Sequence, residues 1–111
     1  MIHMAEGNFP KVSFIIPVLN AAGILENCLQ SIRRQDYPSD RYEIVIVDGG
    51  STDGSQALAQ KYGAIVIDDR ISRHMEDSKK VAVGRAQGEF VVFVDADNEI
   101  THPDYVRLAI L

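Results

Sequence analysis

The sequence is poor in cysteine, lacks tryptophan and contains no long apolar run. Its one cysteine, Cys28, excludes a disulfide within the chain and favours a reducing compartment. A membrane helix needs about 20 consecutive apolar residues, and no stretch approaches that length. The first residues also lack the basic segment and apolar core of a secretory signal. We therefore expect the protein in the cytoplasm, or at the inner face of the membrane.

Basic residues are also scarce. The chain has 11 lysines and arginines against 16 aspartates and glutamates, which gives a net charge of −5. This balance argues against a general nucleic-acid binder, which carries a basic patch, although a small nucleotide site needs only a few local donors. The remaining composition, 46% hydrophobic and 24% charged, is ordinary for a globular protein, and 111 residues are enough for one domain.

The clearest functional signal is the apolar run Phe90–Val94, which stops at Asp95 and Asp97. The run predicts a strand that is buried on both faces in the middle of a parallel sheet. Ligands of open α/β sheets bind at the C-terminal ends of the strands. In continued strand geometry the two carboxylates point the same way and repel each other unless a cation lies between them. The pattern therefore favours an Mg²⁺ or Mn²⁺ site, although turn and capping roles are the alternative.

Strands and helices alternate along the chain. We expect strands at Val12–Pro17, Tyr42–Val47, Ala64–Ile67 and Phe90–Val94. We expect helices at Ile24–Ile32, Ser55–Tyr62 and Ser78–Ala86, with a last helix that starts at Thr101–Asp104. Pro17 ends the first strand because it has no amide to donate. The alternation predicts an α/β, Rossmann-like domain over residues 12–111, after a loose leader of residues 1–11, with about four mostly parallel strands flanked by helices.

Right-handed crossovers place all strand C-termini at one edge of such a sheet, so three loops meet there. They are Pro17–Asn20, Asp48–Gly54 and Asp95–Asn98. The carboxylate of Asp48 can accept a hydrogen bond from a ring N–H of a nucleobase, and it would reject bases without that donor. Alternatively, Asp48 only starts the glycine-rich turn. Gly49 and Gly50 permit a tight turn with positive φ.

Several further residues have both a structural and a functional interpretation. Asn20 and the segment Ser51–Asp53 can cap the helices that follow them. Lys79 lies early in a helix beside Lys80, where it can contact a diphosphate or simply face solvent. Cys28 falls among apolar helix residues and is interpreted as a small buried hydrophobe. Neither of the glycine-rich phosphate-binding motifs, G-x-G-x-x-G and G-x-x-x-x-G-K-[ST], is present.

Three segments together resemble a known family. They are Val12–Asn20, Val45–Ser55 and Gly88–Asp97. With these motifs in this order, the chain from Lys11 onward resembles the N-terminal, nucleotide-binding half of the family 2 inverting glycosyltransferases, which have the GT-A fold. The resemblance implies a Rossmann-like GT-A half domain. It also implies a nucleotide-diphosphate sugar, linked to UDP or GDP, as the donor, and Mg²⁺ or Mn²⁺ as the metal.

The resemblance also implies roles for individual residues. By this resemblance Asp48 recognises the base, Asp95 approaches the ribose and the metal, and Asp97 binds the metal in a D-x-D motif. The remaining nucleotide-binding residues that it implies are Pro17, Val18 and Asn20 in the first loop and Lys79 as a cationic contact. Leu19 departs from the family pattern, since an aromatic residue often stacks on the base at that position.

Family members have a second half that supplies the acceptor site and a carboxylate base. We therefore expect an apparently truncated, donor-binding half that is inactive alone, and we assign no catalytic residue. One alternative is a sugar-phosphate nucleotidyltransferase, but the loop Pro17–Gly23 lacks the arginine and the glycine-rich pattern typical of that class. The other alternative is a non-catalytic assembly module that self-associates through the C-terminal helix, which ends in the apolar segment Leu108–Leu111.

Overall fold

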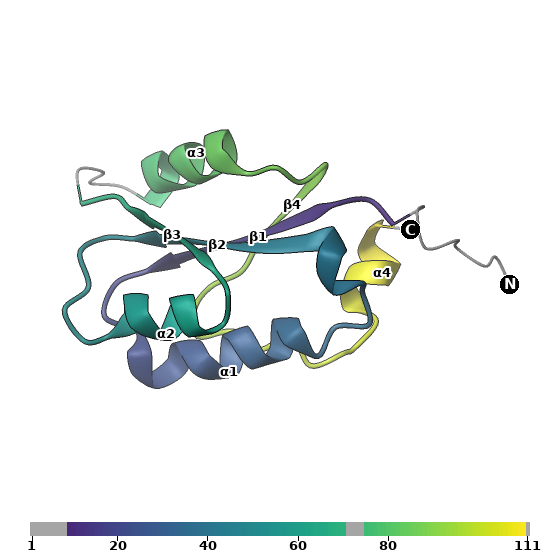
Figure 1. Cartoon of the computed structure of the whole chain (residues 1–111), viewed down its shortest axis with the longest axis horizontal. Helices are drawn as coiled ribbons and strands as arrows, with labels where there is room; N and C mark the ends of the chain where they lie inside the picture. The colour runs from purple at the N-terminus through teal and green to yellow at the C-terminus, as the bar shows by residue number, and fades with distance from the viewer. Residues whose placement is uncertain (1–8, 71–74, 111) are drawn as a thin grey trace, which may run out of the picture.

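The computed structural model describes residues 9–70 and 75–110, and it contains four strands in one parallel sheet (Figure 1). The strands are β1 (Val12–Val18), β2 (Tyr42–Asp48), β3 (Ile65–Asp68) and β4 (Phe90–Phe93). The helices are α1 (Ala22–Arg33), the short 3₁₀ helix η2 (Ser39–Arg41), α2 (Ser55–Lys61), α3 (Met75–Arg85) and α4 (Tyr105–Ile110). The predicted α/β class, with a parallel sheet flanked by helices, is confirmed.

The order of the strands across the sheet is β3-β2-β1-β4. The chain passes outward from β1 to β3 through α1 and α2, which cover one face of the sheet. It returns through α3 on the opposite face and reaches β4 on the other side of β1 (Figure 1). The strand order therefore reverses between β1 and β4. In open α/β sheets the crevice at the C-terminal ends of such a pair is where ligands bind.

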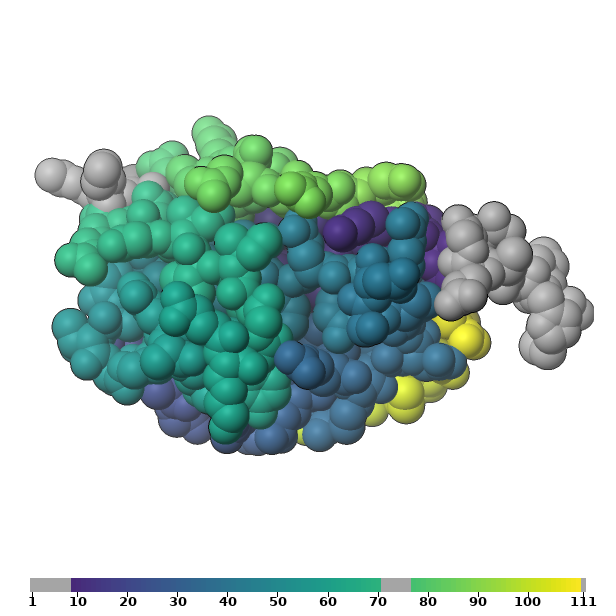
Figure 2. All heavy atoms as spheres, in the orientation of Figure 1, coloured from purple at the N-terminus to yellow at the C-terminus, as the bar shows by residue number. Residues whose placement is uncertain are grey.

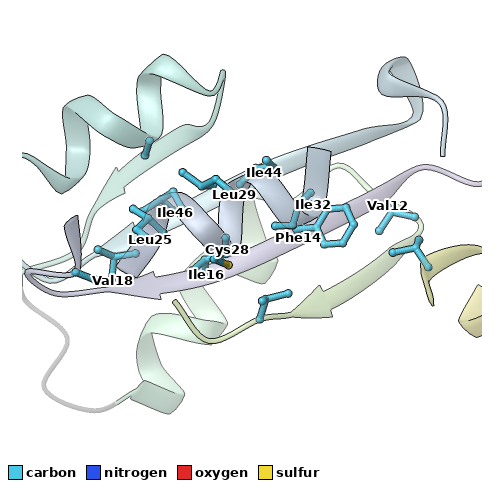
Figure 3. Packing of buried hydrophobic residues seen from close by; sticks show 14 of the residues in the cluster. Val12, Phe14, Ile16, Val18, Leu25, Cys28, Leu29, Ile32, Ile44 and Ile46 are labelled. Atoms are coloured by element: carbon cyan, nitrogen blue, oxygen red, sulfur yellow. The ribbon is translucent and has the colours of Figure 1, made fainter. Parts of the chain in front are cut away.

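The two faces of the sheet bury different side chains of the same strands, because successive residues of a strand point to opposite faces. On the α1 side, Phe14 and Ile16 of β1 pack with Leu25 and Leu29 of α1, and all are fully buried (Figure 3). A smaller cluster on the α3 side contains Ile15, Val45, Val47, Ile67 and Ala82. The continuous apolar runs of β1 and β2 thus belong to strands covered on both faces.

β4 does not lie in the middle of the sheet, so the position predicted from its apolar run is wrong. Among the described strands it pairs with β1 alone, through Val12–Ile15. Its first and last residues are exposed, Phe90 at 43% and Phe93 at 47%. The strands with neighbours on both sides are β2 and β1. β1 is largely covered by other elements, and its purple atoms reach the face seen in Figure 2 mainly near the start of the strand. An apolar run thus identifies a strand but not its place in the sheet.

β1 continues through Pro17 to Val18, whereas the sequence predicts an end at the proline. In a parallel sheet the N–H and C=O of one residue face the same neighbour, and alternate residues face alternate sides. The Ile15 carbonyl accepts a hydrogen bond from the Val94 amide on the β4 side at 2.9 Å, so Pro17 faces that side too. Since the pairing with β4 ends at Ile15, the missing amide of Pro17 disrupts no ladder.

The helix limits also differ in detail from the prediction. α3 begins before the predicted Ser78. α4 begins at Tyr105, after a turn in which the Tyr105 amide donates to the His102 carbonyl at 3.1 Å, and not within Thr101–Asp104. In the part of the chain that the structure describes, none of the helices has the length and apolar character needed to cross a bilayer.

The end of the predicted leader contacts the domain. Phe9 packs edge-on against Tyr37 with ring centroids 5.3 Å apart, and Arg41 Nε donates to the Phe9 carbonyl at 2.7 Å. The Lys11 carbonyl accepts from the Glu89 amide at 2.8 Å. Residues 1–8 of the predicted leader lie outside the described residues. Residues 9–11, which lead into β1, therefore contact the segment that precedes β2 and the segment that precedes β4.

Candidate functional site

The loops after β1 and β2 are joined at the C-terminal edge of the sheet. The Asn20 amide donates to Ser51 Oγ at 2.9 Å, and Asn20 Oδ1 accepts from the Thr52 amide at 2.8 Å. The φ of Asn20 is 49°, in the left-handed region that asparagine adopts more readily than most residues. The prediction that Asn20 caps the next helix is wrong, because its side chain bonds to the second loop and Ala21 occupies the N-cap of α1.

Side chains of the second loop bond to the start of α1 instead. Ser55 Oγ accepts from the Ala21 amide at 3.0 Å, and Asp53 Oδ2 accepts from the Ala22 amide at 3.0 Å. The other oxygen of Asp53 accepts from the Ser55 amide at 3.0 Å, at the start of α2. Hydrogen bonds from the Ser55 hydroxyl and the Ala22 amide lower the pKa of Asp53. The prediction that Ser51–Asp53 caps α2 is wrong, because Gly54 occupies the N-cap. The ionised Asp53 nevertheless accepts a hydrogen bond from the first amide of each helix.

Asp48 lies at the end of β2 and is fully buried. Its carboxylate accepts from the Gly50 amide at 3.1 Å, the Ser51 amide at 2.9 Å and Gln56 Nε2 at 2.6 Å, and also from the Ser51 hydroxyl. Burial by itself would raise the pKa of this carboxyl, but the hydrogen bonds from Ser51, Gln56 and Gly50 outweigh burial and hold the pKa below its usual value. Asp48 thus starts the turn and also keeps a charged acceptor at the sheet edge.

Gly49 and Gly50, next to Asp48, are flanked by two exposed side chains. A Cβ atom on Gly49 would lie 3.7 Å from Leu19 Cδ1, and a Cβ atom on Gly50 would lie 3.4 Å from Arg70 Cγ. Gly50 has a φ of 106°, as the sequence predicts for this turn. Leu19 and Arg70 therefore lie within van der Waals distance of the two glycine positions. Sequence reasoning missed Arg70, because no local spacing connects it to this loop.

Asp95 and Asp97 lie in a turn and not in a continued strand. β4 ends at Phe93, and the Asn98 amide donates to the Asp95 carbonyl at 2.9 Å. The expectation that strand geometry points both carboxylates the same way is therefore wrong. Both side chains are exposed. Burial, together with the charges of Asp97 and Asp95, raises the pKa of Cys28 to about 11, so both carboxylates lie near the same thiol.

The chemistry of this acidic pair fits only one kind of metal site. Within the described residues, no group of three or more His, Cys, Asp or Glu side chains is placed to hold a metal ion. Asp95 and Asp97 offer oxygen ligands, which suit Mg²⁺ or Mn²⁺. Mg²⁺ is commonly held by one or two carboxylates together with the phosphates of a substrate. The pair therefore fits a metal that binds together with a diphosphate and does not fit a metal held by protein side chains alone.

Polar side chains of α1 hold the turn that carries the acidic pair. Cys28 Sγ donates to the Asp95 carbonyl at 3.7 Å, and Ser31 Oγ accepts from the Ile100 amide at 3.0 Å. The two side chains share one face of the helix, since residues three apart are neighbours. The prediction that Cys28 is buried is confirmed. Sequence reasoning missed Ser31, which is also fully buried.

Gln35 continues this line of contacts just after α1. Its Nε2 donates to the His102 carbonyl at 2.8 Å, and its Oε1 accepts from the Val106 amide at 3.0 Å. The Val106 amide belongs to the first turn of α4, where backbone donors have no partner within the helix. Gln35 therefore fastens both the segment after the acidic turn and the start of α4. The signal in the sequence was that Gln35, a polar residue, occupies a position where the helical spacing of the apolar residues of α1 would place another apolar residue.

The remaining predicted residues lie on β1 and on α3. Val18 is buried, and its carbonyl accepts from the Gly49 amide at 2.9 Å, while Pro17 is half-buried. Lys79 lies on α3, and its Nζ is 5.3 Å from the ring centroid of Phe93. This cation–π contact holds Lys79 against the edge strand, on the face of the sheet opposite α1.

The sequence matches the family model for glycosyl transferase family 2 over residues 13–109. Glycosyltransferase AglE of Haloferax volcanii is 32% identical over 95 residues, which make up 79% of this chain and 31% of AglE. The poly(ribitol-phosphate) β-N-acetylglucosaminyltransferase TarS of Staphylococcus aureus is 34% identical over 96 residues, which make up 81% of this chain and 17% of TarS. The matched chain thus spans less than a third of either relative.

Solved structures agree with the sequence match. The mannosyltransferase PcManGT from Pyrobaculum calidifontis, in complex with GDP-Man and Mn²⁺, has a TM-score of 0.84 at 31% identity, over 95% of this chain and 32% of that protein. S. aureus TarS 1–349 in complex with UDP-GlcNAc has a TM-score of 0.82 at 31% identity, over 90% of this chain and 30% of that one. Sequence and fold therefore lead to the same conclusion, and the chain belongs to glycosyl transferase family 2.

Proposed function

We propose that this chain is the donor-binding part of an inverting glycosyltransferase, and that it binds a nucleoside-diphosphate sugar together with a divalent metal. The observation that carries the proposal is that the loops after β1, β2 and β4 all begin at the C-terminal edge of the sheet, where the strand order reverses. PcManGT binds GDP-Man with Mn²⁺, and TarS binds UDP-GlcNAc. These relatives support a nucleotide-sugar donor for this chain.

In this proposal Asp48 accepts a hydrogen bond from the base. Its carboxylate is ionised and preorganised by the turn, so little reorganisation accompanies binding. Asp48 is fully buried, so side chains that cover it must shift for a base to reach the carboxylate, while the turn that holds the carboxylate stays in place. The other residues proposed to contact the nucleotide are Pro17, Val18, Asn20, Lys79 and Asp95.

Asp97 and Asp95 are proposed to hold Mg²⁺ or Mn²⁺ together with the diphosphate. When bound, such a metal acts as a Lewis acid and neutralises the charge that develops on the departing diphosphate. Cys28 Sγ donates to the Asp95 carbonyl, and this contact anchors the backbone that carries the two carboxylates. The chain spans less than a third of AglE and of TarS, so the proposal for this chain is limited to donor and metal binding. None of its described residues is assigned as the base that deprotonates an acceptor.

Isothermal titration with UDP and with GDP, in Mn²⁺ and in chelator, tests the proposal. We expect at least one nucleotide to bind in Mn²⁺, and we expect chelator to weaken its binding about tenfold or more. Asp97→Ala should have a similar effect, since about 1.4 kcal/mol corresponds to a factor of ten. Asp40→Ala is the matched control, because Asp40 is an exposed carboxylate on η2. A folded protein that binds neither nucleotide under any condition would exclude the proposal.

The second candidate function, an assembly module, is favoured by a separate observation. Tyr105 and Leu108 of α4 are 50% and 71% exposed, and α4 lies at the end of the sheet away from the three loops (Figure 1). Exposed apolar side chains on one short helix are typical of contact surfaces. Sedimentation equilibrium of the wild type and of Leu108→Ser tests this candidate, since only an association through α4 would be weakened by the substitution.

A further inference from the structure

Ser31 is a fully buried residue of α1 whose hydroxyl makes two hydrogen bonds. It donates to the Cys28 carbonyl, one turn back in the same helix, at 2.7 Å, and it accepts from the Ile100 amide at 3.0 Å. A serine that bonds only to its own helix slightly destabilises the helix relative to alanine. The contact that explains a serine at this position is therefore the one to Ile100.

Ile100 ends the segment that carries the acidic pair. Asp95 and Asp97 lie between the end of β4 and Ile100. The Asp95 carbonyl, at the beginning of this segment, accepts from Cys28 Sγ at 3.7 Å, and the Ile100 amide, at its end, donates to Ser31. Residues three apart are neighbours on a helix surface, so one face of α1 holds the segment on both sides of Asp97.

The same helix is fixed at its start to the loop that follows Asp48. The amides of Ala21 and Ala22 donate to Ser55 Oγ and to Asp53 Oδ2, both at 3.0 Å. α1 therefore connects the loop after β2 to the segment of the acidic pair. A nucleoside diphosphate that reaches from one to the other needs a particular separation between them, and the contacts of α1 help to set that separation before any ligand binds.

We propose that Ser31, together with Cys28 one turn before it, is a positioning residue for the metal-binding carboxylates and sets the metal-dependent part of the nucleotide affinity. The proposal rests on the proposed function, in which Asp97 and Asp95 hold the metal with the diphosphate. Ser31 acts through the backbone that ends at Ile100 and is assigned no contact with metal or nucleotide. Without its hydroxyl, binding of metal and diphosphate has to order that backbone, which weakens binding.

Ser13 provides a matched control elsewhere in the fold. It is also fully buried, and its hydroxyl donates to Glu43 Oε2 at 2.6 Å and accepts from the Gly88 amide at 2.8 Å. Ser13 lies near the start of β1, at the end of the sheet opposite the candidate site. Ser13→Ala and Ser31→Ala therefore remove the same group from equally buried positions, and each removes the acceptor of one backbone amide. Only Ser31→Ala alters the support of the acidic pair.

Isothermal titration of UDP and GDP, in Mn²⁺ and in chelator, tests the proposal on the wild type and both variants. The readout is the dissociation constant in chelator divided by that in Mn²⁺, for the nucleotide that the wild type binds more tightly. We expect Ser31→Ala to lower this ratio about three- to tenfold, the factor that corresponds to one hydrogen bond, through weaker binding in Mn²⁺. Ser13→Ala should keep the wild-type ratio, although it too loses a buried hydrogen bond.

The possible results separate this proposal from the one on which it rests. A folded wild type that binds neither nucleotide, or binds equally well in Mn²⁺ and in chelator, would overturn the proposed metal-dependent donor site itself. Mn²⁺-dependent binding with an unchanged ratio in Ser31→Ala would overturn the positioning role and leave donor binding intact. An equal fall of the ratio in Ser13→Ala would trace the effect to lost stability and would also overturn that role.

Cys28→Ala replaces Ser31→Ala if the latter does not fold. It removes the contact to the Asp95 carbonyl at the beginning of the same segment, and we expect the ratio to fall in the same direction. An unchanged ratio in folded Cys28→Ala would count against positioning by this face of α1 as directly as an unchanged ratio in Ser31→Ala.

Discussion

The backbone amide of Thr52 donates to the side-chain Oδ1 of Asn20 at 2.8 Å, so a side chain of the β1–α1 loop fixes the backbone of the β2–α2 loop. The Asn20 amide in turn donates to Ser51 Oγ at 2.9 Å. These bonds run in both directions between two loops that are 31 and 32 positions apart in sequence. The loop that contains Pro17 and the loop that follows Asp48 therefore form one unit at the sheet edge.

We expect Asn20→Ala to lower the free energy of unfolding by about 2–3 kcal/mol. The change removes the acceptor for the Thr52 amide, worth about 1 kcal/mol, and puts an alanine at a φ of 49°, which costs roughly 1–2 kcal/mol more. Asn20→Gly removes the same acceptor without the backbone penalty, so it should destabilise the protein less. Urea unfolding of the three proteins measures both terms. An alanine variant as stable as the glycine variant would contradict the left-handed conformation of Asn20.

Acid should destabilise the protein partly through Asp48. Its pKa is lower in the folded protein than the ordinary value near 4, despite burial, because of the hydrogen bonds from Ser51, Gln56 and Gly50. The ionised form is therefore favoured by folding, so this contribution is present above about pH 4 and is lost as the pH falls through the lower folded pKa.

Comparison of Asp48→Asn with the wild type isolates this contribution. We expect the variant to be less stable than the wild type at pH 7, and we expect the difference between the two to shrink as the pH is lowered below about 4. Urea unfolding at a series of pH values measures the difference. Asp40→Asn, on the exposed 3₁₀ helix, is the control. A difference between wild type and Asp48→Asn that stays constant down to pH 2 would show that the carboxylate of Asp48 is not the titrating group.

The sequence predicted the fold class and the edge of the sheet that carries the candidate site, because both depend on local patterns. Apolar runs indicate strands, and the connection rules then bring Asp48 and Asp95 to the same edge. The apolar run Phe90–Val94 did not reveal that β4 lies beside one neighbour only, since the run identifies a strand but neither its degree of burial nor its place in the sheet. The order of the strands depends on which crossover connection reverses direction across the sheet, and the apolar pattern of a strand carries no signal for that.

The long-range side-chain contacts of the site could not be predicted in the same way. Asn20 has the residue type of a helix cap, but its acceptor bonds to Thr52 in another loop. Gln56 and Gln35 bond to partners that no regular spacing relates to them. Such contacts depend on the final packing of α1 and α2 on the sheet, which the sequence pattern of either helix does not determine.

Gln35→Leu should destabilise the segment after the acidic turn. Gln35 is 6% exposed, donates to the His102 carbonyl and accepts from the Val106 amide. Leucine would leave both backbone groups without this partner, which costs about 1–3 kcal/mol for a buried group. We expect a loss of that size in urea unfolding and faster hydrogen exchange at the Val106 amide. Gln60→Leu serves as the control, and unchanged exchange at Val106 would argue against the role of Gln35 at the start of α4.

Gly88 and Gly84 allow one chemical change to be tested in two environments. Gly88 lies in the segment between α3 and β4, which passes close to β1. A Cβ atom at this position would lie 2.6 Å from the Ser13 backbone nitrogen and 2.6 Å from Ser13 Oγ. The Gly88 amide also donates to Ser13 Oγ at 2.8 Å. α3 ends at Arg85, before this glycine. Gly88 is therefore explained by close approach to β1.

We expect Gly88→Ala to lower the free energy of unfolding by about 1–3 kcal/mol, because an added methyl group in a packed site forces the backbone or Ser13 to shift. Gly84→Ala should raise it by about 0.5–1 kcal/mol, since Gly84 lies within α3 with nothing within 4 Å of its Cβ position, and alanine favours helix. The two variants add the same methyl group. Opposite signs of the change in unfolding free energy would therefore show that the surroundings of each glycine, and not the glycine-to-alanine change itself, decide the outcome. Urea unfolding measures both, and a Gly88→Ala protein as stable as Gly84→Ala would show that the link does not approach β1 as closely as described.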